Sequence, residues 1–252
     1  MFQRVREFLA LVSTAVAVGH AGITVTVTGD GNVVGSPTIS SNGDGVDVTV
    51  VVVTDNQVNV AVNATAQDII KTLNIKILSD RPNDDPVRAN LTLQGSGSGR
   101  VVRCENIVRD GTSDSQADLQ ISVVRVRKTT SGTEGNLGVA GSSQGGVIQG
   151  IAIGVVDVEG NITADVTAID GETTGLHSIT TITCDGIIVG DITAPYGGID
   201  EITAGGAIGT VGSPITISAG TALSSTSAGR ILYIEGADVH ANITTNTAGF
   251  VQ

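Results

Sequence analysis

The sequence has very few aromatic and sulfur-containing side chains. Among its 252 residues there is no Trp, and there are two Tyr, three Phe, one Met and two Cys. Wide protein cores are usually anchored by large aromatic side chains. The interior of this chain must therefore be filled by Ile, Val, Leu and Ala, which suits a narrow core lined by stacked aliphatic side chains better than a wide sandwich.

Basic residues are also scarce. Thirteen Lys and Arg stand against 25 Asp and Glu, which gives a net charge of −12. Nucleic acids and anionic lipids are bound mainly by clustered Lys and Arg. The composition therefore argues against nucleic acid as a partner and fits an extracellular surface, or one that collects divalent cations.

Histidine is too rare for the commonest catalytic arrangements. Beyond the first 21 residues there are only His177 and His240, and neither has a partner at a zinc-ligand spacing or in a Ser-His-Asp pattern. Asp238 and His240 are two residues apart and are expected on one strand face. No nucleophile accompanies them, so a solvated surface pair explains them better than catalysis. We assign no catalytic residue, and the sequence favours a non-enzymatic protein.

The N-terminal segment, residues 1–21, is typical of a secretory signal peptide. Two Arg residues precede the apolar run Phe8–Val18, and small residues offer cleavage after Ala17 or Ala21. The alternative is a short amphipathic helix at the start of a cytosolic protein. The run is too short to cross a bilayer, and no later segment has the length and apolarity of a membrane helix. The sequence predicts a secreted or cell-surface protein.

Residues 22–130 alternate between apolar and polar side chains and are expected to form an irregular β-rich part. Runs such as TVTVT at 24–28 and LQISVVRVR at 119–127 have the β-branched content and near-period-two spacing of strands. Clusters such as GDGN at 29–32 predict the turns between them. Residues 64–78 are expected to form a short helix or turn that runs into a strand.

Residues 131–252 contain an internal repeat and are expected to form regular coils. Similar phrases begin at Val155, Ile179, Ile199 and Ile231, and their aliphatic residues can be aligned in three sets. The first set is Val158, Ile182, Ile202 and Ile234; the second is Ile162, Ile188, Ile208 and Val239; the third is Val166, Ile192 and Ile243. Short strands of constant content with variable turns predict a parallel β-helix, a solenoid in which each strand stacks on its copy in the next coil. The six-residue spacing of the left-handed form is not kept, so the right-handed form is favoured; the alternative is an antiparallel β-sandwich.

The two cysteines, Cys104 and Cys184, could pair in an oxidising compartment. The spacing in the sequence does not show that their backbones approach each other. The alignment places Cys184 with Gly160, Ala204 and Gly236, at a position that faces the core. A buried thiol is therefore favoured over a disulfide.

The segment GIDEITAGGAIGTVGSPITISAG, followed by GRILYIEGADVHANIT, resembles the repetitive secreted β-helix proteins of planctomycete-type bacteria. The resemblance covers roughly residues 117–249 and rests on compositional motifs. It implies export and a β-helix, and it implies no activity or catalytic residue.

The best candidate for a binding loop is SDRPNDDPVR at 79–88. It gathers the three acids Asp80, Asp84 and Asp85 with the cation of Arg88, and calcium is the cofactor that such a loop would hold. A Pro-containing surface turn is the simpler interpretation, because the loop lacks the spacing of known calcium motifs. In the regular half, Thr residues separate the acids that flank the core positions, as in a solubilising ladder.

These observations predict a secreted, non-enzymatic β-helix protein with a structural or adhesive role, without a cofactor. The rival hypothesis is a polysaccharide-acting β-helix enzyme, a lyase or hydrolase, that uses Asp80, Asp84 and Asp85 with Arg88 or Arg103. A further expectation concerns partners. The ends of a solenoid are open edges, so copies of the chain could associate end to end or bind a cell-surface polymer.

Overall fold

The computed structural model describes residues 12–18, 22–30, 37–43, 45–52, 57–64, 69–77, 87–95, 103–111, 119–128, 135–139, 145–150, 152–168, 177–221 and 229–245. In these residues the chain is all-β, with two sheets and no α-helix. In the same residues, no helix has the length and apolarity needed to cross a membrane. The expectation of a β-rich chain is therefore confirmed.

Sheet A has nine strands and sheet B has ten. In spatial order, sheet A contains β1 (Val12–Val18), β2 (Ile23–Asp30), β5 (Gln57–Ala64), β7 (Val87–Gly95), β9 (Leu119–Arg127), β12 (Ile153–Val158), β14 (His177–Cys184), β16 (Gly198–Ala204) and β18 (Ile231–Glu235). Sheet B contains β19 (Ala241–Thr245), β17 (Ile215–Ala219), β15 (Ile192–Ala194), β13 (Asp165–Ala168), β11 (Val147–Gly150), β8 (Arg103–Gly111), β6 (Ile69–Ile77), β4 (Gly45–Val52) and β3 (Thr38–Asn42), and β10 (Asn136–Leu137) pairs with β8.

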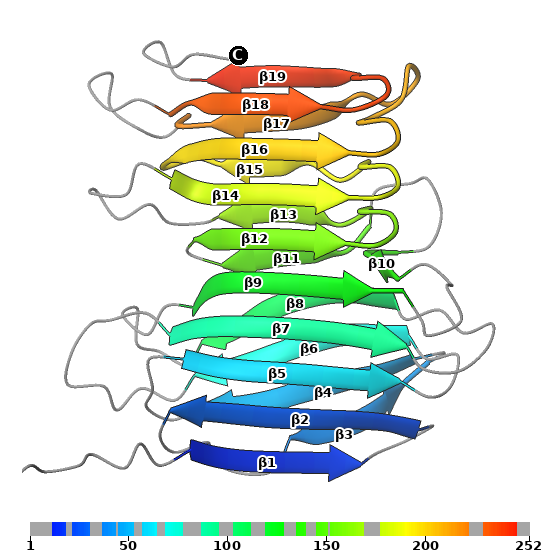
Figure 1. Cartoon of the computed structure of the whole chain (residues 1–252), viewed down its shortest axis with the longest axis vertical. Helices are drawn as coiled ribbons and strands as arrows, with labels where there is room; N and C mark the ends of the chain where they lie inside the picture. Colours follow the sequence, from blue (N-terminus) through cyan, green and yellow to red (C-terminus); the bar gives the residue numbers. More distant parts are fainter. Residues whose placement is uncertain are drawn as a thin grey trace, which may run out of the picture.

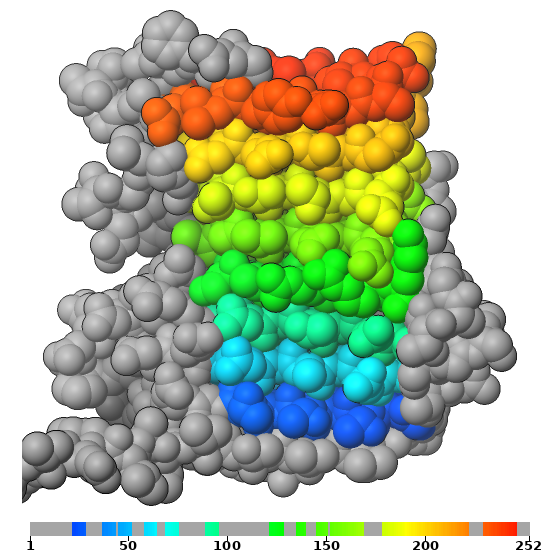
Figure 2. Space-filling model, viewed as in Figure 1, coloured from blue at the N-terminus to red at the C-terminus, as the bar shows by residue number. Residues whose placement is uncertain are grey.

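From β4 onward the chain passes back and forth between the two sheets, and successive strands of each sheet pair in parallel. Antiparallel pairing occurs at the start, between β1 and β2, β2 and β5, and β3 and β4. From β4 onward the strands of the two sheets run in opposite directions, and the layers follow one another in chain order (Figure 1). Figure 2 shows the outer face of sheet A from β2 onward as a stack of coloured bands that follow the chain order.

The core consists of aliphatic columns that run through the stack, because parallel pairing places equivalent residues of successive strands next to one another. In sheet A one column contains Val60, Leu91, Val124, Val156, Ile182, Ile202 and Ile234. In sheet B one column contains Ile148, Val166, Ile192, Ile217 and Ile243. Single bridges form a third column from Leu137, Ile162, Ile188, Ile208 and Val239. The side chains of all three columns are buried except at their last members.

The second and third aligned sets of the sequence are confirmed as columns, with Ile217 as a member that the alignment omitted. The first set is wrong at one position. Val156 is the partner of Ile182, and Val158 is the partner of Cys184. A two-residue slip keeps every side chain on the same strand face, so the valine pair gave the same apolar pattern in either register.

Other expectations are also corrected or sharpened. The helix expected within residues 64–78 is wrong over 69–77, because this segment is strand β6 with buried Ile70, Leu73 and Ile75. Leu73 and Ile75 alternate as one inner sheet face requires, and a register irregularity after Ile70 brings Ile70 to the same face. The pairing from β4 onward is parallel, so the antiparallel alternative holds only for the first strands. The expected signal peptide includes β1, which pairs with β2 over seven residues.

Both sheets continue across the expected boundary at residue 130. Strand β9 pairs with β12, and β8 pairs with β11. The strands differ in length, since β6 to β9 have nine residues each whereas β13 has four and β15 three. The shorter strands leave room for tight turns in the second part.

These turns are linked from layer to layer by Asn and Asp side chains. Asn136 Oδ1 accepts a hydrogen bond from Asn161 N–H at 2.8 Å, and Asn161 Oδ1 accepts one from Ile187 N–H at 2.9 Å. On another turn, Asp165 Oδ1 accepts from Asp191 N–H at 2.8 Å, and Asp191 Oδ1 accepts from Thr216 N–H at 2.6 Å. Each side chain satisfies a backbone donor of the next layer, which would otherwise lack a partner within a strand ladder.

Candidate functional site

The candidate site is a groove of about 630 Å³ on sheet A, beside the ends of β12, β14, β16 and β18. It is lined by the acids Asp157, Asp185 and Glu235, by the hydroxyls of Thr183 and Thr203, and by small residues. Asp157, Thr183, Thr203 and Glu235 occupy one cross-strand row. The two Thr residues separate the two acids, so like charges are not adjacent in the row.

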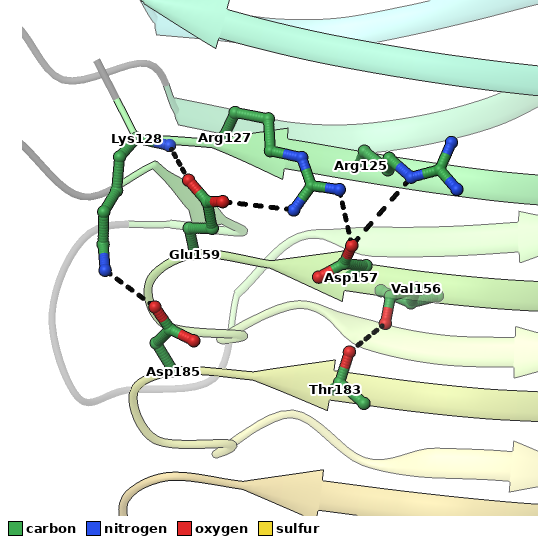
Figure 3. Close-up of polar contacts among 8 residues, drawn as sticks. All are labelled: Arg125, Arg127, Lys128, Val156, Asp157, Glu159, Thr183 and Asp185. Atoms are coloured by element: carbon green, nitrogen blue, oxygen red, sulfur yellow. Dashed lines mark hydrogen bonds and ion pairs between the residues drawn. The ribbon is translucent and has the colours of Figure 1, made fainter. Parts of the chain in front are cut away.

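Arg127 joins two acids at the groove's first layer (Figure 3). Its Nη2 lies 2.6 Å from Asp157 Oδ2, and its Nη1 lies 3.2 Å from Glu159 Oε1. Arg125 Nε is 3.9 Å from the same Asp157 oxygen. The Arg127 side chain is 28% exposed, so this pair of contacts is partly shielded from solvent. Parallel pairing explains the contact with Asp157, because Arg125 is its direct partner on β9 and Arg127 is two residues further along the same outer face.

Lys128 extends the same network along the stack (Figure 3). Its backbone N–H donates to Glu159 Oε2 at 2.7 Å, and its Nζ lies 2.7 Å from Asp185 Oδ2. Lys128 is the last basic residue of the sequence before Arg230, whereas 12 acids follow residue 130. The three cations of 125–128 thus neutralise acids of the next two layers of sheet A.

Glu235 and Tyr233 form a contact at the far end of the groove. The Tyr233 hydroxyl donates to Glu235 Oε2 at 2.5 Å. This hydrogen bond, together with the negative charge of Glu235, raises the pKa of Tyr233. The acids of the groove are therefore already engaged: Asp157 and Asp185 by cations, and Glu235 by a hydroxyl.

Cys184 is buried at the groove wall and carries a free thiol. Its Sγ donates to Gly186 O at 3.4 Å. Burial, with a further contribution from Asp185, raises the pKa of the Cys184 thiol to about 12. Such a thiol is almost entirely protonated at neutral pH and is a poor nucleophile. The prediction that Cys184 packs as a small apolar residue is confirmed, but its alignment with Gly160 is wrong, because its partner in the preceding layer is Val158. Cys104 belongs to β8 of sheet B, opposite Leu137, and its side chain lies outside the described part.

The acidic loop singled out in the sequence lies outside the described residues at Asp80, Asp84 and Asp85. The backbone places Arg88 near the start of β7 in sheet A and Arg103 at the start of β8 in sheet B. Strands of the two sheets run in opposite directions (Figure 1), so these two positions lie at opposite sides of the body. Arg88 lies on the side of the body where β6 ends and β7 begins, next to the residues that flank the loop, and Arg103 lies on the other side.

Asp238 and His240 flank the bridge residue Val239, and the structure engages them through their backbones. Ile208 N–H donates to Asp238 O, and His240 N–H donates to Ile208 O. Within the part of the chain that the structure describes, no group of three or more His, Cys, Asp or Glu residues is arranged to hold a metal ion. The hydroxyls and carboxylates of the groove can accept and donate hydrogen bonds to a polar ligand, and they include no activated nucleophile.

The cluster of Arg125, Arg127 and Lys128 was not identified from the sequence. Its acidic partners are 30 to 57 residues away in the chain, and only the layer register brings them together. The one signal was the change of charge near residue 130, where the basic residues stop. Comparison with protein-family models, with curated proteins and with solved structures finds no match to the chain.

Proposed function

We propose that the chain is a secreted, non-enzymatic β-helix protein with a structural or adhesive role at the cell surface. The observation that carries this proposal is the engagement of the groove's acids by Arg127, Lys128 and Tyr233. A carboxylate that acts as a general base must be free to take a proton in reach of the substrate. The carboxylates held by Arg127 and Lys128 instead join one layer of the stack to the next, and Glu235 is held by a hydroxyl of its own strand.

The right-handed parallel β-helix is part of the same proposal. It is supported by the passage of the chain between two parallel sheets and by the third column of bridges at the turns. Right-handed crossover connections between parallel strands are strongly preferred in proteins, which favours that hand here. Export is supported by the charged and apolar pattern of residues 1–21.

The test uses the full chain expressed in a bacterium with a general secretory pathway. We expect the protein outside the cytoplasm, with a new N-terminus after Ala17 or Ala21 by mass spectrometry. The purified protein should sediment with insoluble cell-wall polysaccharide and release no oligosaccharide from acidic polysaccharides. An intact N-terminus on cytoplasmic protein would contradict export.

The rival function is a polysaccharide-acting enzyme that uses Asp80, Asp84 and Asp85 with Arg88. It predicts oligosaccharide release that is lost in Asp84→Ala and retained in Asp157→Asn, a change in the ion-pair cluster. Such a result would replace the structural proposal. Calcium belongs to this rival, so chelation of calcium should then abolish the release.

A further inference from the structure

Both sheets end in an unpaired strand edge at the C-terminal end of the stack. Strand β18 pairs with β16 and is the last strand of sheet A, and β19 pairs with β17 and is the last strand of sheet B. Within the described residues, nothing pairs with the other edge of either strand. The two strands lie at the same end of the body (Figure 1). Open edges of this kind are sites of pairing with another chain.

The aliphatic columns are uncovered at the same end. Ile243 is 39% exposed, whereas Ile217, its partner one layer below, is 0% exposed. Val239 is 43% exposed, whereas Ile208 below it is 0% exposed. This end face is therefore continuous with the layer-to-layer interfaces of the stack: it is the same kind of surface that each earlier layer presents to the next. A ligand that fits it must offer β-strands at the same spacing with aliphatic side chains between them.

The N-terminal end does not offer such a surface. The antiparallel strand β1 covers β2, whose Ile23, Val25 and Val27 are 0% exposed. Strand β3 is antiparallel to β4, so its direction is opposite to that of the later strands of sheet B. Strand β1 has the same direction as the later strands of sheet A, because two antiparallel steps separate it from β5. While β1 is in place, head-to-tail stacking would thus need parallel pairing in one sheet and antiparallel pairing in the other.

A second copy of the same C-terminal end meets these requirements by symmetry. A twofold axis normal to the sheets places β18 beside β18 and β19 beside β19, both antiparallel, and the spacing between the sheets is matched by construction. Charge supports this orientation. Arg230 directly precedes β18 and Glu235 ends it, so antiparallel alignment brings Arg230 of one copy near Glu235 of the other at both ends of the strand.

We propose that the chain forms a twofold dimer through its C-terminal end, with β18 and β19 paired to the same strands of a second copy. Each sheet then continues through both molecules, and Ile243 and Val239 are covered. The proposal does not depend on adhesion or on the absence of catalysis. Cleavage after Ala17 or Ala21 would remove all or nearly all of β1 and leave β18 and β19 unchanged, so the C-terminal end is the same in the exported protein.

Sedimentation equilibrium of the full chain over a range of concentrations tests the dimer. We expect a species of twice the 25.3 kDa chain mass. Ile243→Lys and Val239→Lys each place a charge on the end face and should raise the dissociation constant at least tenfold. Val139→Lys is the matched control, because Val139 is 36% exposed and lies just after β10, which pairs with β8, several layers away from β18 and β19. Circular dichroism establishes that each variant is folded. Two end-face variants are used so that the test still stands if one of them does not fold.

A charge exchange tests the orientation of the pairing. Glu235→Arg should weaken the dimer, and the double variant with Arg230→Glu and Glu235→Arg should restore it toward the affinity of the unchanged chain. A single-chain mass at all concentrations would overturn the proposal. The proposal would also be overturned if both end-face variants dimerised as tightly as the unchanged chain, or if the chain formed open-ended polymers. It would equally be overturned if the double exchange variant bound no more tightly than Glu235→Arg.

Discussion

At the scale of single residues, the chain uses its few reactive and charged groups for packing and pairing. Cys184 occupies the position at which the next layer has Ala204, and burial holds its thiol in the protonated form. Arg127 occupies an outward position and contacts both Asp157 in β12 and Glu159, which directly follows β12. From the sequence alone, both side chains are candidates for a reactive or binding role. In the structure, both serve packing or ion pairing.

The raised pKa of Cys184 predicts a loss of stability at alkaline pH. The folded protein favours the neutral thiol, so its stabilising effect is fully present below the unfolded pKa of about 8.5 and is lost as pH rises toward 12. Between pH 8 and pH 10 the free energy of unfolding should fall by about 2 kcal/mol more in the unchanged protein than in Cys184→Ala. Urea unfolding at the two pH values measures this. Equal pH dependence in the two proteins would contradict it.

The two arginines of the cluster should differ in their effect on stability. Arg127→Gln removes contacts to two acids and should lower the free energy of unfolding by about 1 kcal/mol, since the group is partly exposed. Arg125→Gln is the control, with a single contact at 3.9 Å, and should change it by less than about 0.5 kcal/mol. The difference should shrink in 1 M NaCl, because salt screens exposed charges. Equal losses from both changes would count against a bridging role for Arg127.

At the scale of strands and turns, the architecture depends on close layer-to-layer contact. Gly190 lies in a turn where a Cβ would overlap the carbonyl oxygen of Ala164 in the layer below. Ile192, two residues later, is fully buried in the column of sheet B. A turn residue and a strand residue only two positions apart thus both pack closely against the previous layer.

Alanine at Gly190 should be strongly destabilising. The clash is with backbone, which cannot move without breaking the ladder, so we expect a loss of about 2 to 4 kcal/mol in the free energy of unfolding. Gly212→Ala is the matched control, because a Cβ there meets nothing within 4 Å, and its effect should stay within about 0.5 kcal/mol. Thermal and urea unfolding of both variants provide the comparison. A tolerant Gly190 would mean that the turns are looser than the contacts indicate.

Two isoleucines of one column provide a second contrast. Ile192→Ala leaves a cavity in the closed part of the stack and should cost about 2 to 5 kcal/mol. Ile243→Ala, at the uncovered end of the same column, should cost about 1 kcal/mol or less in the monomer, since the side chain is already 39% exposed. Urea unfolding at a concentration below dimer formation measures both. Equal costs would show that the end of the column is covered.

The sequence predicted the spacing of the core aliphatic residues better than the register in which successive strands pair. Ile162, Ile188, Ile208 and Val239 could be aligned because each follows a core aliphatic residue, a small residue and a short turn. Val156 and Val158 could not be distinguished, because strand side chains repeat every two residues. The pairing of Arg127 with Asp157 also escaped prediction, since the length of the intervening segment alone does not fix which residues become neighbours. The interlayer bonds of Asn161 and Asp191 depend on the same register.

At the scale of the whole molecule, a stack in which each layer touches its neighbours should lose structure from its ends. Stability in such arrays is a sum of layer and neighbour terms, so an end layer has one neighbour interface where an inner layer has two. In hydrogen exchange monitored by mass spectrometry, the amides of β18 and β19 should exchange faster than those of β14 and β15 in the monomer. Uniform exchange along the stack would instead show a single cooperative unit.

The bonds by which Asn136, Asn161, Asp165 and Asp191 reach the adjacent layer have a consequence for how such a chain can grow. Each bond is made to a backbone N–H, so it does not depend on the identity of the side chain in the next layer. A segment that carries one aliphatic set and one such turn residue is therefore interchangeable with its neighbours. Duplication or deletion of a gene segment of that length would change the height of the molecule by whole layers, and the hydrogen bonds between the remaining layers would be kept.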